Sequence, residues 1–199
     1  MAEGRTRTRL SPEARKDQLL DTAKQMIVSD GLQMFTMESL ARTAEVSGPL
    51  VYNYFSSRQD LLGTLLEREY QAYVEKLTAK VSTAETFEDV VRVFVGSNFD
   101  HHAPGNILPI LQSQPEIASM NRSVREQHGR QVASYLVQNT AKTYNLTKKQ
   151  AELVVSMSSG ASVAAAESAT LNRASRKKTI NTVMEYILAG LDSISSQKK

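Results

Sequence analysis

The sequence predicts an all-α protein in which three N-terminal helices precede a series of longer ones. Capping boxes at 57–60, 86–89 and 147–150 each indicate the start of a helix. Between 62 and 81 the apolar residues recur three or four positions apart, which is the period of one helix face. Of the 199 residues, 41% are hydrophobic, so the chain can bury a sizeable core.

The composition argues against several classes of protein. The chain has no cysteine, which excludes disulfides and thiolate metal sites and fits a reducing compartment. Its basic N-terminus is not followed by an apolar stretch, and no run approaches the roughly 18 apolar residues that cross a bilayer. We therefore expect a cytoplasmic protein without a membrane partner. The chain has only three histidines and no Gly-rich phosphate loop, and we find no arrangement of residues typical of a catalytic, cofactor or metal site. We therefore expect that the protein is not an enzyme.

Positive charge is concentrated at the start of the chain. The net charge is only +3, and residues 1–60 carry as many acidic as basic side chains. Residues 1–10 have no apolar periodicity and predict a flexible arm that contains Arg5, Arg7 and Arg9. Any affinity for nucleic acid must therefore depend on local geometry and not on a uniformly basic surface.

Residues 11–57 contain the signals of three helices. Ser11 is the predicted N-cap of the first helix, and Gly31 is expected to end it. Thr36 and Ser47 are the predicted N-caps of the second and third helices. Each has a hydrophobic residue directly before the cap and another four positions after it, the spacing of a hydrophobic staple. Because only a few residues separate these two short helices, the pattern predicts a helix-turn-helix.

The third helix has one apolar face and one polar face. Val51 and Phe55 are four residues apart and can pack on a core, whereas Tyr52, Asn53 and Tyr54 point elsewhere. Buried phenol and amide groups need hydrogen-bond partners, and on a DNA duplex the phosphates supply them. The alternative is an αα corner of the kind found in any helical protein. Two further features favour DNA over that alternative.

These features are cationic side chains at the edges of the helix-turn-helix. Arg58 lies at the start of the fourth helix, where the positive end of the helix dipole favours a phosphate. Arg5, Arg7 and Arg9 of the arm could enter an adjacent minor groove.

The run TMESLARTAEVSGPLVYNYFSSRQDLL at 36–62 resembles the helix-turn-helix of the TetR family, the tetracycline-repressor type of bacterial transcription regulators. The shared pattern is a Thr-capped helix with Leu-Ala, then Val-Ser, then aliphatic-Tyr-x-aromatic-Phe, then Ser-basic-x-acidic-Leu. The motif covers roughly 11–66. The resemblance implies a DNA-binding domain at 11–57 and an effector-binding and dimerisation domain at 58–199.

The resemblance also implies which residues contact DNA. The positions that match phosphate contacts are Thr36, Arg42, Tyr52, Tyr54 and Arg58. The positions that match the part of the helix facing base edges are Ser47, Gly48, Pro49, Leu50 and Asn53. No Arg, Lys or Gln is available there for a bidentate base contact, so readout is expected to use thymine methyl groups and DNA shape. Glu45 stands where the family commonly has Gly, and it would be strained if its φ is positive.

The C-terminal two-thirds of the chain predicts a helical body with an effector site. Residues 106–114 are apolar but contain Pro109, which excludes a long regular helix and suggests a pocket wall. The candidate effector-binding residues are Phe94, Phe99, Leu111 and Tyr135. The alternative is that these side chains belong to the core. Adjacent His101 and His102 do not share a helix face, so no metal site is expected.

The last two predicted helices each carry a seam of apolar or small residues with a period near 3.5. The residues are Met157, Gly160 and Ala164 in one helix, and Ile180, Met184, Ile187 and Leu191 in the other. Such a pair can form half of a four-helix dimer bundle, or it can form a hairpin within one chain. The resemblance favours the homodimer.

The sequence and the resemblance together predict a DNA-binding transcriptional regulator. The expected form is a homodimeric repressor that binds a near-palindromic operator on double-stranded DNA and is released by a small lipophilic effector. The alternative function is a helical small-molecule-binding or scaffold protein whose helix-turn-helix is only structural.

Overall fold

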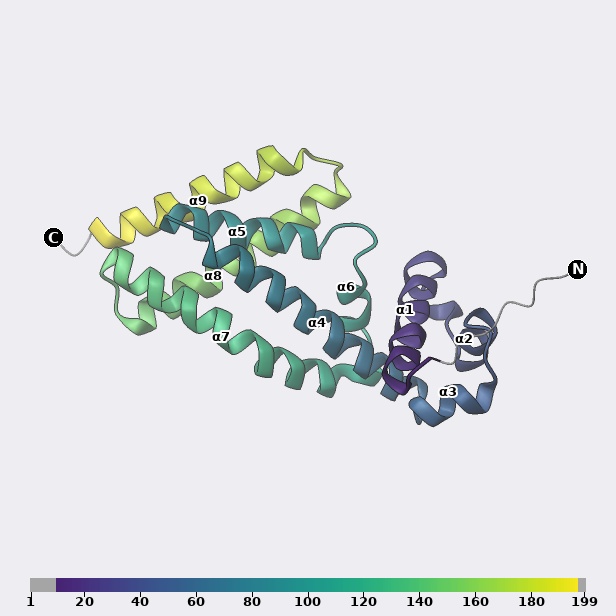
Figure 1. Cartoon of the computed structure of the whole chain (residues 1–199). Coiled ribbons are helices and arrows are strands. Elements are labelled where there is room, and N and C mark those ends of the chain that lie inside the picture. The colour runs from purple at the N-terminus through teal and green to yellow at the C-terminus, as the bar shows by residue number, and fades with distance from the viewer. Residues whose placement is uncertain (1–9, 197–199) are drawn as a thin grey trace, which may run out of the picture. The chain divides into compact units, whose positions relative to one another are not determined.

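The computed structural model describes residues 10–196, and every regular element among them is a helix (Figure 1). The predicted all-α fold class is therefore confirmed. The elements in chain order are α1 (Pro12–Asp30), the 3₁₀ turn η1 (Leu32–Met34), α2 (Met37–Thr43), α3 (Gly48–Tyr54), α4 (Arg58–Ser82), α5 (Phe87–His101), α6 (Ile107–Gln112), the 3₁₀ turn η2 (Pro115–Ile117), α7 (Ala118–Tyr144), α8 (Lys148–Leu171) and α9 (Arg176–Ser196).

The chain divides into two compact units, residues 1–65 and 66–199. The division lies inside α4, whereas the sequence placed the boundary at the start of this helix. The first turns of α4 belong to the first unit because Arg58 hydrogen-bonds to backbone oxygens of Leu32 and Phe35. In the described part of the chain, no helix is both long and apolar enough to span a membrane.

Side-chain caps determine where the helices of the first unit begin. The hydroxyl oxygens of Ser11, Thr36 and Ser47 accept hydrogen bonds from backbone N–H groups three residues further on, at 3.2, 3.0 and 3.4 Å. These caps satisfy N–H groups that have no partner within the helix. All three predicted N-caps are therefore confirmed. The core of this unit includes fully or almost fully buried Leu19, Leu20, Ala23, Ile27, Leu40, Val51 and Phe55.

In the second unit, α5 packs against both α8 and α9, and α7 packs against α8. The capping boxes predicted at 86–89 and 147–150 begin α5 and α8. A buried hydrogen bond of 3.1 Å from Asn98 Nδ2 to Ser162 Oγ joins α5 to α8 inside the apolar core. Pro109 lies in α6, which is only six residues long, as the position of the proline requires.

The apolar seam of α9 lies in this core. The four seam residues Ile180, Met184, Ile187 and Leu191 are only 2–6% exposed, and they pack with residues of α5 and α8. The prediction that these four residues form a dimer surface is therefore corrected: they pack inside the core of a single chain, as the alternative of an intrachain hairpin predicted. The seam of α8 differs, because Met157 is 58% exposed and Gly160 and Ala164 are exposed too.

Candidate nucleic-acid interface

The turn between α2 and α3 is closed by backbone hydrogen bonds. Val46 N–H donates to Ala41 O at 2.9 Å, and Ala44 N–H donates to Leu40 O at 2.8 Å. Glu45 lies between them with φ of 54°, in the left-handed region. The predicted strain at this residue is thus present, because a side chain is disfavoured at positive φ.

Glu45→Gly is expected to stabilise the first unit by about 1 kcal/mol, since glycine adopts positive φ without a steric cost. It also removes a carboxylate beside the proposed DNA surface. Thermal unfolding measures the first effect, and duplex binding measures the second. Glu45→Gln is the control, because it removes the charge and keeps the strain. A melting temperature of Glu45→Gly equal to or below that of the parent chain would contradict the strain.

The apolar face of helix α3 packs on the core of the first unit, and its polar face is exposed to solvent. Val51 and Phe55 are 0% and 1% exposed, whereas Tyr52 is 48% exposed and Asn53 is exposed. Tyr54 is half-buried. The division into a core face and a free face is the one that the sequence predicted for this helix.

The remaining predicted base-edge residues lie at the start of α3. Ser47 and Pro49 are exposed, and Gly48 and Leu50 are half-buried. The exposed Pro49 and the half-buried Leu50 are the apolar side chains available here for contact with thymine methyl groups.

The Tyr52 hydroxyl already has a partner within the unit. It donates to Glu38 Oε1 at 3.4 Å, which joins α3 to the first turn of α2. Sequence reasoning did not single out Glu38. The two residues are 14 positions apart, so no helical spacing relates them. A phosphate that binds Tyr52 would have to replace this carboxylate.

Arg58 is directed toward the protein and not toward a free surface. Its Nε donates to Phe35 O at 3.3 Å and one terminal nitrogen donates to Leu32 O at 3.2 Å. The guanidinium carbon also lies 6.0 Å from the centre of the Phe35 ring. The side chain predicted to hold a phosphate therefore joins α4 to the first residue of η1 and to the residue that follows η1.

Other cationic and capping groups lie on the surface of this unit. Arg42 is exposed on α2, and Thr36 is exposed while its hydroxyl caps the same helix. Lys16 of α1, which sequence reasoning did not select, is exposed and has its nitrogen 5.9 Å from the centre of the Phe55 ring. The arm with Arg5, Arg7 and Arg9 is outside the described residues.

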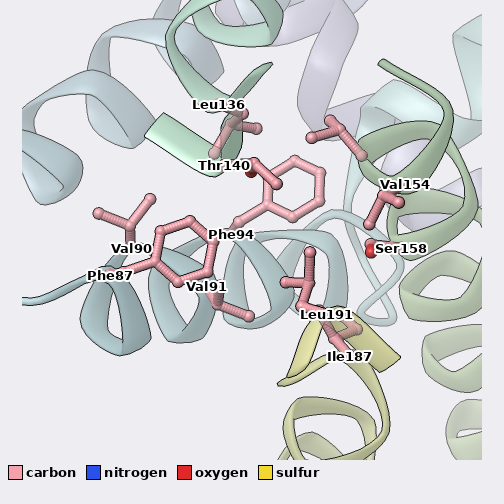
Figure 2. A pocket seen from close by; sticks show the side chains of 11 residues that line it. Phe87, Val90, Val91, Phe94, Leu136, Thr140, Val154, Ser158, Ile187 and Leu191 are labelled. Atoms are coloured by element: carbon pink, nitrogen blue, oxygen red, sulfur yellow. The ribbon is translucent and has the colours of Figure 1, made fainter. Parts of the chain in front are cut away.

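An apolar pocket lies in the second unit between α5, α7, α8 and α9 (Figure 2). Its empty volume is about 380 Å³, part of which is open to solvent. The lining residues are Phe87, Val90, Val91, Phe94, Leu136, Thr140, Val154, Val155, Ser158, Ile187 and Leu191. Sequence reasoning found one of them, Phe94, because a pocket formed by four helices has no signature in any single one.

The other three predicted effector residues are placed elsewhere. Phe99 and Leu111 are buried at 6% and 0% exposure, and Tyr135 is 41% exposed. They do not line the pocket. Phe99 matches the alternative in which aromatic residues at helical spacing belong to the core.

A helical unit in which two short capped helices, α2 and α3, are joined by a tight turn and α3 exposes its polar face has the build of a helix-turn-helix DNA-binding domain. The family model described as bacterial regulatory proteins of the tetR family matches residues 19–65. The chain thus contains the helix-turn-helix domain of this family.

Curated relatives support this assignment. The HTH-type transcriptional regulator LuxR of Vibrio harveyi is 29% identical over 117 residues, which are 59% of this chain and 49% of LuxR. The HTH-type transcriptional repressor NemR of Escherichia coli K12 is 33% identical over 70 residues, 35% of each chain. The chain thus spans half or less of the length of these two relatives.

Solved structures extend the likeness of fold to the second unit. FadR from Bacillus subtilis in complex with stearoyl-CoA superimposes with a TM-score of 0.71 at 16% identity. The match covers 87% of this chain and 98% of FadR. At this identity the likeness concerns the fold alone.

Proposed function

We propose that this protein regulates transcription by binding double-stranded DNA as a homodimer through α2 and α3. The observation that carries the proposal is α3 itself. It is fastened by buried Val51 and Phe55, and it exposes Tyr52 and Asn53. Phosphate contacts would come from Thr36, Arg42, Tyr52 and Tyr54, and base contacts from Pro49, Leu50 and Asn53 with Ser47 and Gly48.

A homodimer would supply the two recognition helices that a near-palindromic operator needs. The supporting surface is the exposed face of α8, which includes Leu153, Met157, Gly160 and Ala164. A Cβ added at Gly160 would meet nothing within 4 Å, so the backbone there is open to close approach by another helix. Exposed large apolar side chains around small residues are typical of a helix-pairing surface.

The regulatory outcome we propose is repression, relieved by a small lipophilic effector. A dimer on a promoter blocks polymerase without any further chemistry. The apolar pocket of the second unit and the stearoyl-CoA bound by B. subtilis FadR support a lipophilic ligand. By linkage, effector and DNA must weaken each other's binding by the same factor. Increased expression from a reporter whose promoter contains the bound sequence would instead indicate an activator.

The first test is to select bound sequences from random duplexes with the full chain and to compare variants on the selected site. Tyr52→Phe removes the hydroxyl that would donate to a phosphate. Loss of one charge-assisted hydrogen bond is expected to lower DNA affinity about tenfold. Glu38→Gln is expected to raise affinity, because it removes a negative charge that would repel a phosphate bound at this hydroxyl. Fluorescence anisotropy measures both.

The matched control is Tyr135→Phe, an exposed tyrosine of α7 in the second unit, which should leave DNA affinity unchanged. If no duplex is enriched, or if Tyr52→Phe binds as the parent chain does, the regulator function fails. The alternative is then a small-molecule-binding or scaffold protein with a structural helix-turn-helix.

A further inference from the structure

The described part of the first unit has more acidic than basic side chains. Residues 10–65 contain five arginines and lysines and seven aspartates and glutamates, which gives a net charge of −2. A protein gains affinity for a duplex mainly where its lysines and arginines neutralise phosphates. The few cations that are available on this unit therefore decide how its proposed DNA surface binds.

Three of these five cations are engaged within the protein. Arg58 donates to two backbone oxygens. Arg15 is half-buried and donates to Gln18 Oε1 at 2.5 Å. Lys24 is half-buried and interacts with another group of the protein. Each of these side chains would have to give up an interaction before it could bind a phosphate.

The other two cations, Lys16 and Arg42, are exposed, and within the described residues their side chains make no hydrogen bond or ion pair. They come from opposite ends of α3. Arg42 lies in the last turn of α2, and its backbone oxygen accepts from Glu45 N–H at 3.2 Å in the turn that leads into α3. The nitrogen of Lys16 is 5.9 Å from the ring centre of Phe55, the residue that caps the end of α3.

The start of α4 does not offer a phosphate site beside this end of α3. Asp60 Oδ2 accepts from the backbone N–H of Ser56 at 2.8 Å and from its hydroxyl at 3.0 Å. The carboxylate of Asp60 thus has the place that an anion would take at the helix start, and it would repel a phosphate there. Because Arg58 is directed inward as well, Lys16 is the available cation at this end of α3 among residues 10–65.

The length of α3 matches the width of the groove that a recognition helix enters. The helix has seven residues and is therefore about 10 Å long, and the major groove is about 12 Å wide. A phosphate strand borders the groove on each side. One cation at each end of α3 can thus contact opposite strands, and two such contacts fix the orientation of the helix more firmly than one.

We propose that Lys16 is a phosphate ligand of the DNA-binding unit, and that Lys16 and Arg42 bind phosphates on opposite strands, one at each end of α3. The inference rests on the proposed function, because it names contacts of the same surface. Lys16 takes the part that the inward-facing Arg58 does not fill. The ring of Phe55 restrains the ammonium group without neutralising it, so the charge remains available to a phosphate.

The first test measures how the affinity for the selected duplex depends on salt. Each neutralised phosphate contributes about 0.9 to the slope of log affinity against log salt concentration. Lys16→Gln removes one contact from each subunit of the proposed dimer, so the slope should become shallower by about 1.8. Affinity should fall by a similar factor on the selected duplex and on an unrelated one, because phosphates carry no sequence information.

Two controls separate a phosphate contact from a general effect of charge. Lys16→Arg keeps the cation and should keep the slope. Lys177→Gln removes the same charge from an exposed position of α9 and should leave the slope unchanged. Circular dichroism shows whether Lys16→Gln is folded. Lys16→Met, which keeps a long apolar side chain against the Phe55 ring, replaces it if it is not.

The second test identifies the phosphates. Those of one half-site are replaced one at a time by neutral methylphosphonates, and binding is compared for the parent chain, Lys16→Gln and Arg42→Gln. We expect one replacement that weakens the parent chain about tenfold and leaves Lys16→Gln unaffected. A second replacement, on the opposite strand, should have the same relation to Arg42→Gln.

The outcomes distinguish this inference from the proposed function. If the parent chain binds a duplex but Lys16→Gln keeps its slope, Lys16 is not a phosphate ligand and the regulator function stands. If the phosphates coupled to Lys16 and Arg42 lie on the same strand, the arrangement across the groove is wrong. If the parent chain binds no duplex, the proposed function fails, and this inference fails with it.

Discussion

Arg58→Ala is expected to destabilise the first unit by about 2 kcal/mol, because it leaves two backbone oxygens without a charge-assisted donor. Leu32 O and Phe35 O lie where η1 leads into α2, so the loss loosens the connection between α1 and the helix-turn-helix. The cation over the Phe35 ring is lost as well. DNA affinity should fall because the recognition helix is no longer held, and not because a phosphate contact is missing.

Urea unfolding followed by circular dichroism, with hydrogen exchange on residues 12–54, measures this loss. Arg42→Ala is the matched control, because Arg42 is an exposed arginine on α2. It should leave stability within about 0.5 kcal/mol while it weakens DNA binding. Arg58→Lys should recover only part of the stability, since one ammonium does not reproduce the planar fork of arginine. If Arg58→Ala unfolds as the parent chain does and yet loses DNA affinity, Arg58 is a phosphate ligand after all.

Arg58 also illustrates why the sequence predicted the caps and not every contact. The caps at Ser11, Thr36 and Ser47 depend on groups three residues away, so the sequence contains both partners of each bond. The acceptors of Arg58 are 23 and 26 residues distant, and only the packing of α4 on the first unit brings them together. The Tyr52–Glu38 bond was missed for the same reason.

The two C-terminal seams show a second limit of sequence patterns. An apolar stripe with a period near 3.5 has the same appearance whether it faces its own core or another subunit. In α9 the stripe through Met184 and Ile187 is buried within the chain, while in α8 the stripe through Met157 remains exposed. The pocket could not be predicted for a related reason. Its lining residues come from four helices, and the sequence of a single helix does not show which residues of the others will lie beside it.

The exposed apolar stripe of α8 contains Met157, where we expect a substitution to have a large effect on dimerisation. We expect Met157→Lys to convert the proposed dimer to a monomer, because it places a charge without a partner in an apolar interface. The side chain is 58% exposed in the single chain, so the substitution should leave the fold of the subunit intact. Sedimentation velocity measures the change in mass, and circular dichroism confirms the fold.

Thr143→Lys is the control, since it adds the same charge at an exposed position of α7. It should sediment as the parent chain does. A Met157→Lys chain that remains dimeric would exclude this face of α8 from the interface.

The same variant connects dimerisation to DNA recognition. Two linked recognition helices bind half-sites about 34 Å apart as one ligand, so the second contact forms at a high effective concentration. A monomer keeps every contact of α3 and loses this advantage. We therefore expect Met157→Lys to bind a full operator about 100-fold more weakly, and a single half-site as tightly as the parent chain. Equal losses on both duplexes would place the defect in α3 itself, and the homodimer would then not be the origin of affinity.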